Sequence, residues 1–241
     1  MFYFRAAEAR GKANFGWLNS QHTFSFGDYY DPDHMGISVL RVINDDIVAP
    51  GAGFGEHGHR DMEIISYILE GSIEHKDSMG NQFIVPAGDV QRMSAGTGVR
   101  HSEFNASKTE PLKFLQIWIS PNVKGIEPSY EQMAVVQSST MTPLVTPTGR
   151  DGSLSINQDA SLSRLQLQAG ESYTLDTQNP SVQKEVGYLH VIAGSAVADQ
   201  HALNGQNALK LGDGLGIIKD QLSITAGHEG LVALWFDLPG R

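Results

Sequence analysis

The sequence predicts an all-β protein of two tandem antiparallel β-barrel or jelly-roll domains with few short helices. Three observations carry this prediction: short runs rich in β-branched and aromatic residues, glycine-rich turns between those runs, and a pattern of segments that recurs in the second half of the chain. Strands at regular spacing with turn signals between them are typical of sandwiches and barrels, whereas alternating strands and helices would indicate a parallel sheet.

The expected strands are short, and each is bounded by Gly, Pro, Asp or Asn. They cover residues 37–43, 63–69, 83–85, 112–119, 188–192 and 231–236. Helical periodicity of useful length is nearly absent. The best helix candidate covers residues 130–136, where Ser129 is a suitable N-cap after Pro128.

Three glycines of the first half recur in order in the second half. They are Gly51, Gly71 and Gly88, followed by Gly170, Gly194 and Gly212. Matched segments in the same order favour duplication of one β-domain over chance recurrence of turn residues. We therefore expect an N-terminal domain over residues 1–125, a connecting segment over 126–147 and a C-terminal domain over 148–241. Trp118 and Trp235 are interpreted as matched packing residues of the two repeats.

Charge and composition exclude several classes of function. The 27 acidic and 17 basic residues give a formal net charge of −10, and a surface of this sign repels phosphate backbones. We therefore expect no nucleic-acid partner. The chain has no cysteine, which excludes disulfides, thiolate metal sites, iron–sulfur clusters and a cysteine nucleophile.

The segment at residues 1–10, MFYFRAAEAR, carries charges and has no apolar core of the kind found in signal peptides. The longest apolar runs are interrupted within a few residues, far short of the ~20 that a membrane helix needs. We expect a cytoplasmic protein with no membrane partner.

Two short polar pairs are the candidate chemical site: His57-Gly-His59, after a glycine-rich turn, and His101-Ser-Glu103. Side chains alternate between the faces of a strand, so the two members of each pair point the same way. Two strands bringing these pairs together would place three imidazoles and one carboxylate around a transition metal. Four protein ligands would leave two octahedral positions for substrate, water or O₂. Fe(II), Mn, Ni, Cu and Zn all remain open on this reasoning.

Other polar residues have simpler interpretations. Glu63 is a weaker candidate ligand, since Glu103 already supplies a carboxylate, and Glu56 points to the opposite face from His57. His75, between charged neighbours, is interpreted as a surface residue near a turn. In the second half, the segment that repeats the His-x-His region reads ESYTLDTQ and has no histidine. We therefore expect a C-terminal domain that kept the fold and has no metal ligands.

Three segments carry a resemblance to a known family. They are GWLNSQHTFSFGDYYDPDHMGISVLRVINDD, PGAGFGEHGHRDMEIISYILEGSIEHKDSMGN and MSAGTGVRHSEF. In this order and spacing they strongly resemble bacterial pirin-like proteins of the cupin superfamily. The interval from Gly88 to His101 is longer than in most cupins, as it is in the pirin branch. The resemblance is dense in the first half and looser toward the C-terminal LWFDLP, and it implies a bicupin fold.

The resemblance also implies an activity. It gives His57, His59, His101 and Glu103 as ligands of one divalent metal ion, with iron as the usual metal and Zn, Ni, Cu, Mn or Co as alternatives. Bacterial relatives act as quercetin 2,3-dioxygenases, which open a flavonol heterocycle with O₂ and release carbon monoxide. Glu103 would then act as the base for the flavonol 3-hydroxyl.

Two other functions stay open. One is a metal-dependent regulator that binds a protein partner without turnover, as described for eukaryotic pirins. The other is a metal-free scaffold, which the concentration of all four donors in one domain disfavours. An aromatic pocket for the substrate could be lined by residues among Phe24, Phe26, Tyr29, Tyr30 and Trp118.

Overall fold

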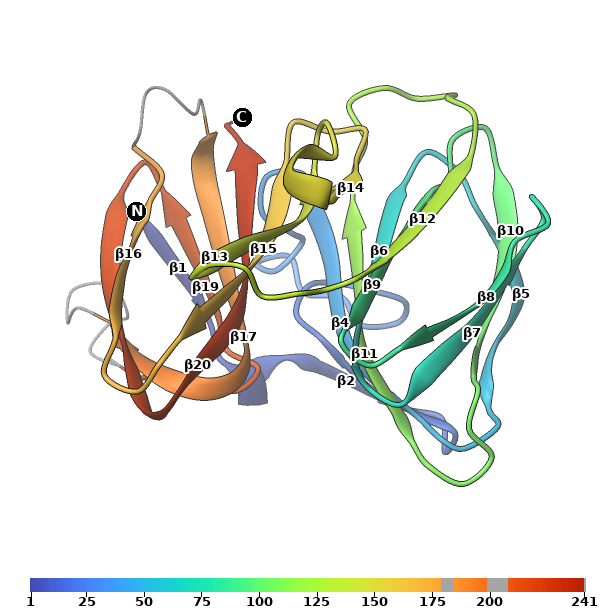
Figure 1. Ribbon diagram of the computed structural model, residues 1–241, viewed down its shortest axis with the longest axis horizontal. Coiled ribbons are helices and arrows are strands. Elements are labelled where there is room, and N and C mark those ends of the chain that lie inside the picture. The colour runs from blue at the N-terminus through green and yellow to red at the C-terminus, as the bar shows by residue number, and fades with distance from the viewer. Residues whose placement is uncertain (179–183, 199–207, 241) are drawn as a thin grey trace. The chain divides into compact units, whose positions relative to one another are not determined.

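The computed structural model describes residues 1–178, 184–198 and 208–240 (Figure 1). Within these residues the regular structure is β-strand apart from two short 3₁₀ turns, η1 (Ala7–Ala9) and η2 (Arg150–Gly152). The contacts divide the chain into two compact units. The N-terminal unit comprises Gly11–Val135 and Pro147–Gln158, and the C-terminal unit comprises the described residues of Met1–Arg10, Val136–Thr146 and Asp159–Arg241. The expected boundaries at 125/126 and 147/148 stay a prediction.

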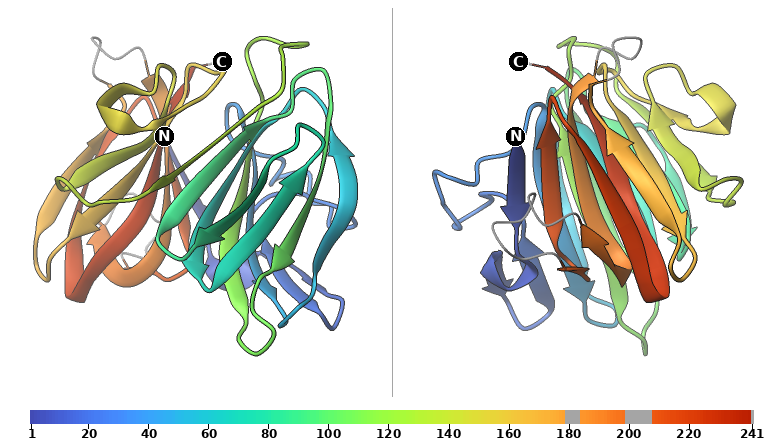
Figure 2. Two further views of the ribbon diagram at one scale, coloured as in Figure 1. Left: turned by 45° about the vertical axis from the view of Figure 1, so that its right-hand side comes forward. Right: turned by 90° about the vertical axis from the view of Figure 1, so that its left-hand side faces the viewer.

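The N-terminal unit has two antiparallel sheets. One has the order β5-β10-β7-β8, and the other has the order β12-β9-β6-β11-β4-β3-β2 (Figures 1 and 2). Side chains such as Ile68, Val85 and Phe114 fill a core cluster of this unit. The strands are β2 (Gly11–Asn14), β3 (Leu18–His22), β4 (Leu40–Val48), β5 (Gly53–His59), β6 (Glu63–Glu70), β7 (Ser72–Asp77), β8 (Gln82–Pro86), β9 (Asp89–Ser94), β10 (Val99–Asn105), β11 (Leu112–Ile119), β12 (Ser129–Ala134) and β14 (Leu154–Ser155).

The C-terminal unit is built on a sheet with the order β1-β19-β17-β20-β15-β13, with β16 paired to β20 and β18 paired to β17. Its first strand comes from the start of the chain, since β1 pairs with β19 from Phe2↔Ile217 to Arg5↔Gly214. Its strands are β1 (Phe2–Arg5), β13 (Met141–Thr146), β15 (Ser161–Leu167), β16 (Ser172–Asp176), β17 (Lys184–Ala198), β18 (Ala208–Lys210), β19 (Gly214–Ile218) and β20 (Gln221–Pro239). The expected strands at 188–192 and 231–236 are parts of the longer β17 and β20.

The matched glycines have matched geometry. Gly71 and Gly194 adopt φ values of 76° and 70°, in the left-handed region that favours glycine. A Cβ atom would lie 2.9 Å from the Pro111 carbonyl oxygen at Gly71, and 2.1 Å from the Gly230 carbonyl oxygen at Gly194. Each glycine therefore lies close to the backbone of a partner strand, the start of β11 for Gly71 and the middle of β20 for Gly194, which supports the predicted repeat.

The registers correct one assignment within the repeat. Gln116 on β11 is paired with Ser66 on β6, and Trp235 on β20 is paired with Leu189 on β17. Ser66 lies five residues before Gly71, and Leu189 lies five residues before Gly194, the matched glycine. Trp235 therefore corresponds to Gln116, and the expected match between Trp235 and Trp118 is wrong.

The expected helix over 130–136 is also wrong, because residues 130–134 belong to strand β12. It completes the sheet edge at β9, with Ser129 opposite Ser94 and Ala134 opposite Asp89. Ser129, expected as an N-cap, instead accepts a 2.7 Å hydrogen bond from the buried Arg92 guanidinium. A seven-residue helix has little intrinsic stability, so pairing with an open sheet edge decides the structure.

No helix among the described residues is both long and apolar enough to cross a membrane.

Candidate metal centre

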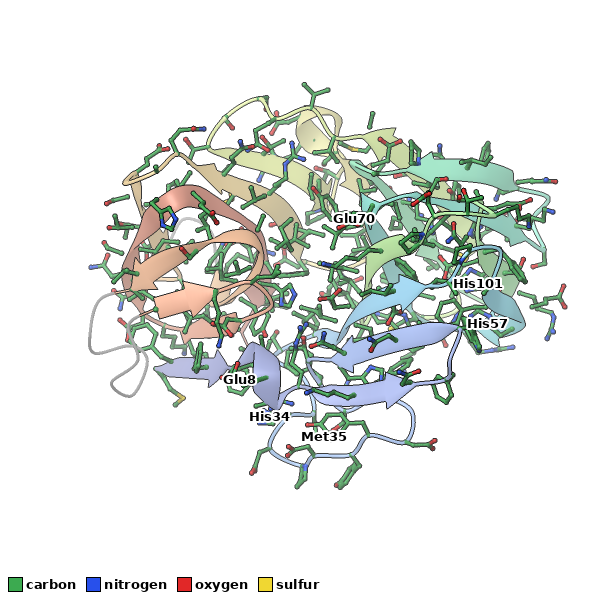
Figure 3. The ribbon with its side chains drawn as sticks, turned by 90° about the horizontal axis from the view of Figure 1, so that it is seen from below. Glu8, His34, Met35, His57, Glu70 and His101 are labelled. Carbon is green, nitrogen blue, oxygen red and sulfur yellow. The ribbon has the colours of Figure 1, made fainter. Side chains whose placement is uncertain are left out.

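The two polar pairs lie on adjacent antiparallel strands. The register of β5 and β10 places His57 directly opposite His101 and His59 opposite Val99. A β-bulge then shifts the register, so that Glu103 is opposite Phe54. Bulges of this kind redirect side chains near functional sites. Figure 3 shows His57 and His101 beside each other at one side of the molecule.

The three imidazoles converge. Ligand nitrogens of His57, His59 and His101 lie within 4.8 Å of one another, and the Nε2 atoms of His57 and His101 are 3.0 Å apart. The Nδ1 atom of His57 lies 2.8 Å from the Gly55 carbonyl oxygen. A carbonyl can only accept, so Nδ1 carries the proton and Nε2 keeps its lone pair toward the other rings.

Two of these rings are held in the neutral form. Burial lowers the pKa of His101 to about 3 and the pKa of His59 to about 4, with further lowering by neighbouring histidines. A neutral imidazole presents the lone pair that a metal ion needs, whereas a protonated one repels the ion. The environment therefore prepares nitrogen donors at neutral pH.

Glu103 is buried, with 3% of its surface exposed, and three side chains hold its carboxylate. Its Oε1 accepts hydrogen bonds from Ser66 Oγ at 3.2 Å and Gln91 Nε2 at 2.8 Å. Its Oε2 accepts one from Gln116 Nε2 at 2.9 Å. A carboxylate offers about four lone-pair sites, so one remains, on Oε2.

The chain's donor groups fit a divalent transition metal. Two overlapping groups could hold an ion: His57, His59 and His101 form one, and His75, His101 and Glu103 form the other. Three imidazole nitrogens with a nearby carboxylate suit Fe, Mn, Co, Ni, Cu or Zn, since thiolates are absent from the sequence. Glu103 belongs to the second group and shares His101 with the first.

His75 is not the surface residue that its charged neighbours suggest. Its side chain is fully buried, its Nε2 lies 3.0 Å from Asp77 Oδ2, and its ring stacks on Tyr130 with centroids 4.6 Å apart. The Tyr130 hydroxyl lies 2.9 Å from Gln91 Oε1, which orients the amide that donates to Glu103. His75 therefore belongs to the second possible ligand group, and through Tyr130 and Gln91 its contacts also reach the Glu103 carboxylate.

The two remaining carboxylates lie elsewhere. Glu63 is buried, but its Oε2 accepts a 2.7 Å hydrogen bond from Ser94 Oγ, and its Oε1 lies 3.3 Å from Asn157 Nδ2. Glu56 is exposed and pairs with Arg100 at 2.7 Å. Glu63 is therefore a structural residue, and Glu56 lies on the solvated face, as expected.

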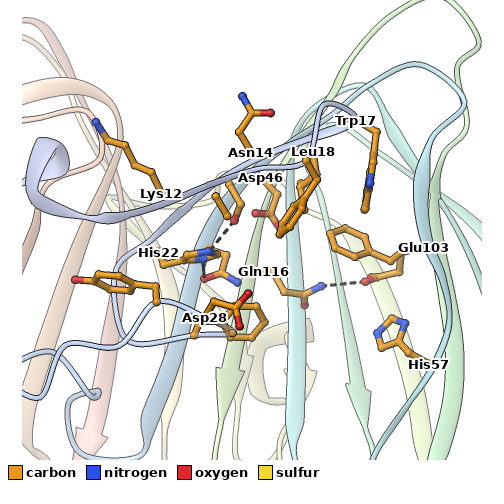
Figure 4. Close-up of a pocket in the computed structure, with 18 of the residues that line it drawn as sticks. Lys12, Asn14, Trp17, Leu18, His22, Asp28, Asp46, His57, Glu103 and Gln116 are labelled. Atoms are coloured by element: carbon orange, nitrogen blue, oxygen red, sulfur yellow. Dashed lines mark hydrogen bonds between the residues drawn. The ribbon is translucent and has the colours of Figure 1, made fainter.

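A cavity of about 900 Å³ opens onto the centre and is lined by side chains of the N-terminal unit (Figure 4). The aromatic side chains in its lining are Phe15, Trp17, Phe26, Tyr29, Phe54 and Trp118. The Trp118 ring packs edge-on against His59, with centroids 5.0 Å apart. Of the expected pocket residues, Phe24 is buried in the core and Tyr30 is 72% exposed, and neither lines the cavity.

Two family models match the chain. The pirin model matches residues 3–119, and a model described as a quercetinase C-terminal cupin domain matches residues 143–238. The quercetin 2,3-dioxygenase of Escherichia coli strain K12 is 48% identical over 240 residues, which cover 99% of both proteins. The chain belongs to the pirin family.

Solved structures agree with this assignment. The bacterial pirin YhhW from Escherichia coli in complex with nickel(II) is 45% identical over the full length of both chains, with a TM-score of 0.91. The quercetin 2,3-dioxygenase from Acinetobacter baumannii is 18% identical with a TM-score of 0.73, covering 99% of this chain and 79% of that one, and shows the fold alone. The predicted pirin resemblance and the predicted all-β bicupin fold are both confirmed.

Proposed function

We propose that this pirin is a metal-dependent dioxygenase of the quercetin 2,3-dioxygenase type, which cleaves a flavonol heterocycle with O₂ and releases carbon monoxide. The observation that carries this proposal is the convergence of three imidazoles, those of His57, His59 and His101, at one end of an aromatic-lined cavity. The near-identical length and 48% identity to a protein of that name support it.

We assign His57, His59, His101 and Glu103 as the ligands of one divalent ion. The proposed metal is Fe(II), and Zn, Ni, Cu, Mn and Co remain alternatives, since a relative of known structure binds nickel(II). When bound, such an ion supplies Lewis acidity and a centre for O₂ chemistry. The ligands come from β5 and β10, whose pairing fixes the geometry before any ion arrives.

Glu103 has a second proposed role, as the base that accepts the proton of the flavonol 3-hydroxyl. The carboxylate has one lone pair left after its three hydrogen bonds, on Oε2. Ligation and proton transfer therefore compete for the same atom. We infer that Glu103 performs one of these roles at a time, and that Ser66, Gln91 and Gln116 keep it pointed at the centre during the exchange.

The cavity provides the substrate site. Its aromatic walls suit a flat polyphenol, which gains from ring contacts and from the exclusion of water. Trp118 and Phe26 pack edge to face with centroids 5.4 Å apart, which holds one wall rigid. A flavonol fits this shape and carries the oxygen atoms that a metal binds.

The test is O₂ uptake and carbon monoxide release by metal-loaded protein with quercetin. We expect turnover in the wild type and none in His101→Leu, with Glu56→Gln as a matched control at an exposed carboxylate of β5. Full turnover by Glu103→Gln would contradict the base role. Metal binding without turnover of any flavonol would instead favour the regulator with a protein partner. The cytoplasmic location stays a prediction.

A further inference from the structure

A row of polar side chains continues from the Glu103 cluster across the larger sheet of the N-terminal unit. The pairing runs His22↔Asn44, Asn44↔Gln116, Gln116↔Ser66 and Ser66↔Gln91, across strands β3, β4, β11, β6 and β9. Directly paired residues present their side chains on the same face of a sheet. The row therefore forms one polar band, made of His22, Asn44, Gln116, Ser66 and Gln91. Glu103 accepts hydrogen bonds from the last three of these side chains.

The far end of this band is a separate polar group on β3 and β4. Ser20, His22, Asn44 and Asp46 all line the cavity, and each is at least nine-tenths buried. His22 Nδ1 lies 2.8 Å from Asn44 Oδ1 and 3.4 Å from Ser20 Oγ. Figure 4 shows His22 and Asp46 on the opposite side of Gln116 from Glu103 and His57.

This end contains a buried polar atom that no described residue satisfies. Asp46 is 3% exposed, and its Oδ1 has no hydrogen-bond partner among the described residues. Gln116 Oε1, in the middle of the band, has none either within that part of the chain. An unsatisfied buried polar atom destabilises a folded protein, so such an atom is kept mainly where a water, an ion or a ligand atom binds it.

The surroundings indicate what binds there. The His22 ring lies 5.3 Å from the Phe26 ring and 6.3 Å from the Tyr29 ring, nearly parallel to the latter, so the polar atoms stand among aromatic faces. Burial also raises the pKa of Asp46 to about 7, so its carboxyl is protonated in part of the molecules at neutral pH and can donate as well as accept. A neutral aromatic hydroxyl matches both features.

We propose that Ser20, His22, Asn44 and Asp46 form a second polar subsite that binds a ring hydroxyl of a polyhydroxylated aromatic substrate, at the end of the cavity remote from the candidate metal centre. The inference rests on the proposed function for the class of ligand. It assigns specificity to this subsite: the metal end takes the oxygens common to all flavonols, and the remote end selects those with further hydroxyls.

The experiment is calorimetric binding without O₂, with metal-loaded protein and two flavonols. Quercetin carries further ring hydroxyls, and unsubstituted 3-hydroxyflavone does not. We expect the wild type to bind quercetin about 10-fold more tightly or better, the effect of one good hydrogen bond to a buried carboxyl. In Asp46→Leu the preference should fall to about 2-fold, with the affinity for 3-hydroxyflavone unchanged.

Two further variants keep the test decisive. His22→Phe retains the ring that faces Phe26 and Tyr29 but removes its nitrogens, so it should also reduce the preference, whether or not Asp46→Leu folds. Ile47→Val is the matched control, because Ile47 is the next residue on β4 after Asp46, is 39% exposed and does not line the cavity. The preference of this control variant for quercetin over 3-hydroxyflavone should equal that of the wild type.

The outcomes separate the two proposals. Three outcomes overturn the subsite. The variants could lose affinity for both flavonols equally, the wild type could show no preference for quercetin, or neither compound could bind. A preference that depends on Asp46 and His22 in a protein that shows no O₂ uptake supports the subsite and overturns the dioxygenase. Turnover of quercetin with an unchanged preference in both variants overturns the subsite alone.

Discussion

The two units carry side chains of opposite polarity at equivalent positions of their sheets. In the N-terminal unit, three neighbouring strands present Gln116, Ser66 and Gln91 in direct register. In the C-terminal unit, the corresponding strands present Trp235, Leu189 and Leu215 in the same register. The first three hold the Glu103 carboxylate, and the other three belong to a buried apolar cluster.

The difference shows that the fold itself does not need the polar band. A unit with the same turns and registers packs its centre with aliphatic and aromatic side chains. Polar side chains are needed in the N-terminal unit because a buried carboxylate without donors would be strongly destabilising. The polar band is therefore explained by the candidate metal centre, and the described residues of the C-terminal unit show which apolar side chains take the equivalent positions.

Removing one imidazole should have the largest effect. We expect His101→Leu to weaken metal affinity by more than about 100-fold and to abolish turnover, because it deletes a donor shared by both candidate ligand groups. Metal titration followed by calorimetry measures it. The matched control is His190→Leu, at a buried histidine of the C-terminal unit. Equal loss in both variants would contradict the assignment of the centre to the N-terminal unit.

Making the C-terminal unit polar should be the most destabilising change to the fold. Trp235 is 4% exposed and packs so closely on Gly187 that a Cβ there would lie 2.0 Å from the indole ring. We expect Trp235→Gln to lower the free energy of unfolding by about 3–5 kcal/mol, through a cavity and a buried amide without partners. Urea unfolding measures it. The metal affinity of the N-terminal unit should not change. A change would show that metal binding there depends on the packing of the C-terminal unit.

Making the N-terminal unit apolar should have a smaller effect that depends on Glu103. Gln116→Leu removes a donor from a buried carboxylate, so we expect it to lower the free energy of unfolding of metal-free protein by about 1–3 kcal/mol. Adding Glu103→Leu should restore that stability, since no buried carboxylate is then left without its donor. A double-mutant cycle measures the coupling. Additive effects would mean that Gln116 does not act through Glu103.

Acid should produce the most gradual effect, spread over several pH units. Burial lowers the pKa values of His59, His101 and His190 from 6.5 to about 4, 3 and 3. Below about pH 6.5 the unfolded chain therefore binds more protons at these three histidines than the folded chain does. The raised pKa of Asp46, about 7, opposes this with one proton, so the net stability still falls as the pH falls toward 4. Above pH 6.5 the three histidines contribute no pH dependence. Thermal unfolding of metal-free protein across this range measures it, and a flat profile would contradict the burial of these rings.

The sequence alone predicted those features that depend on residues a short distance apart in the chain. A period of two placed His57 with His59 and His101 with Glu103, and glycines in the same order in both halves indicated the repeat; the structure places these glycines at positive φ. Local sequence could not reveal the Glu103 donors, because Ser66, Gln91 and Gln116 come from three strands and meet only through sheet register. It misplaced His75, whose charged neighbours indicate exposure, although the topology places β7 inside a sheet between β8 and β10.

The pairing of β1 with β19 has a consequence for synthesis of the chain. Phe2 leaves the ribosome long before its partner Ile217 is synthesised. At ~5–20 residues per second, the first strand waits on the order of 10 to 40 seconds for its neighbour. During that interval the apolar side chains of Phe2 and Phe4 have no cluster to join, so they stay exposed on the nascent chain.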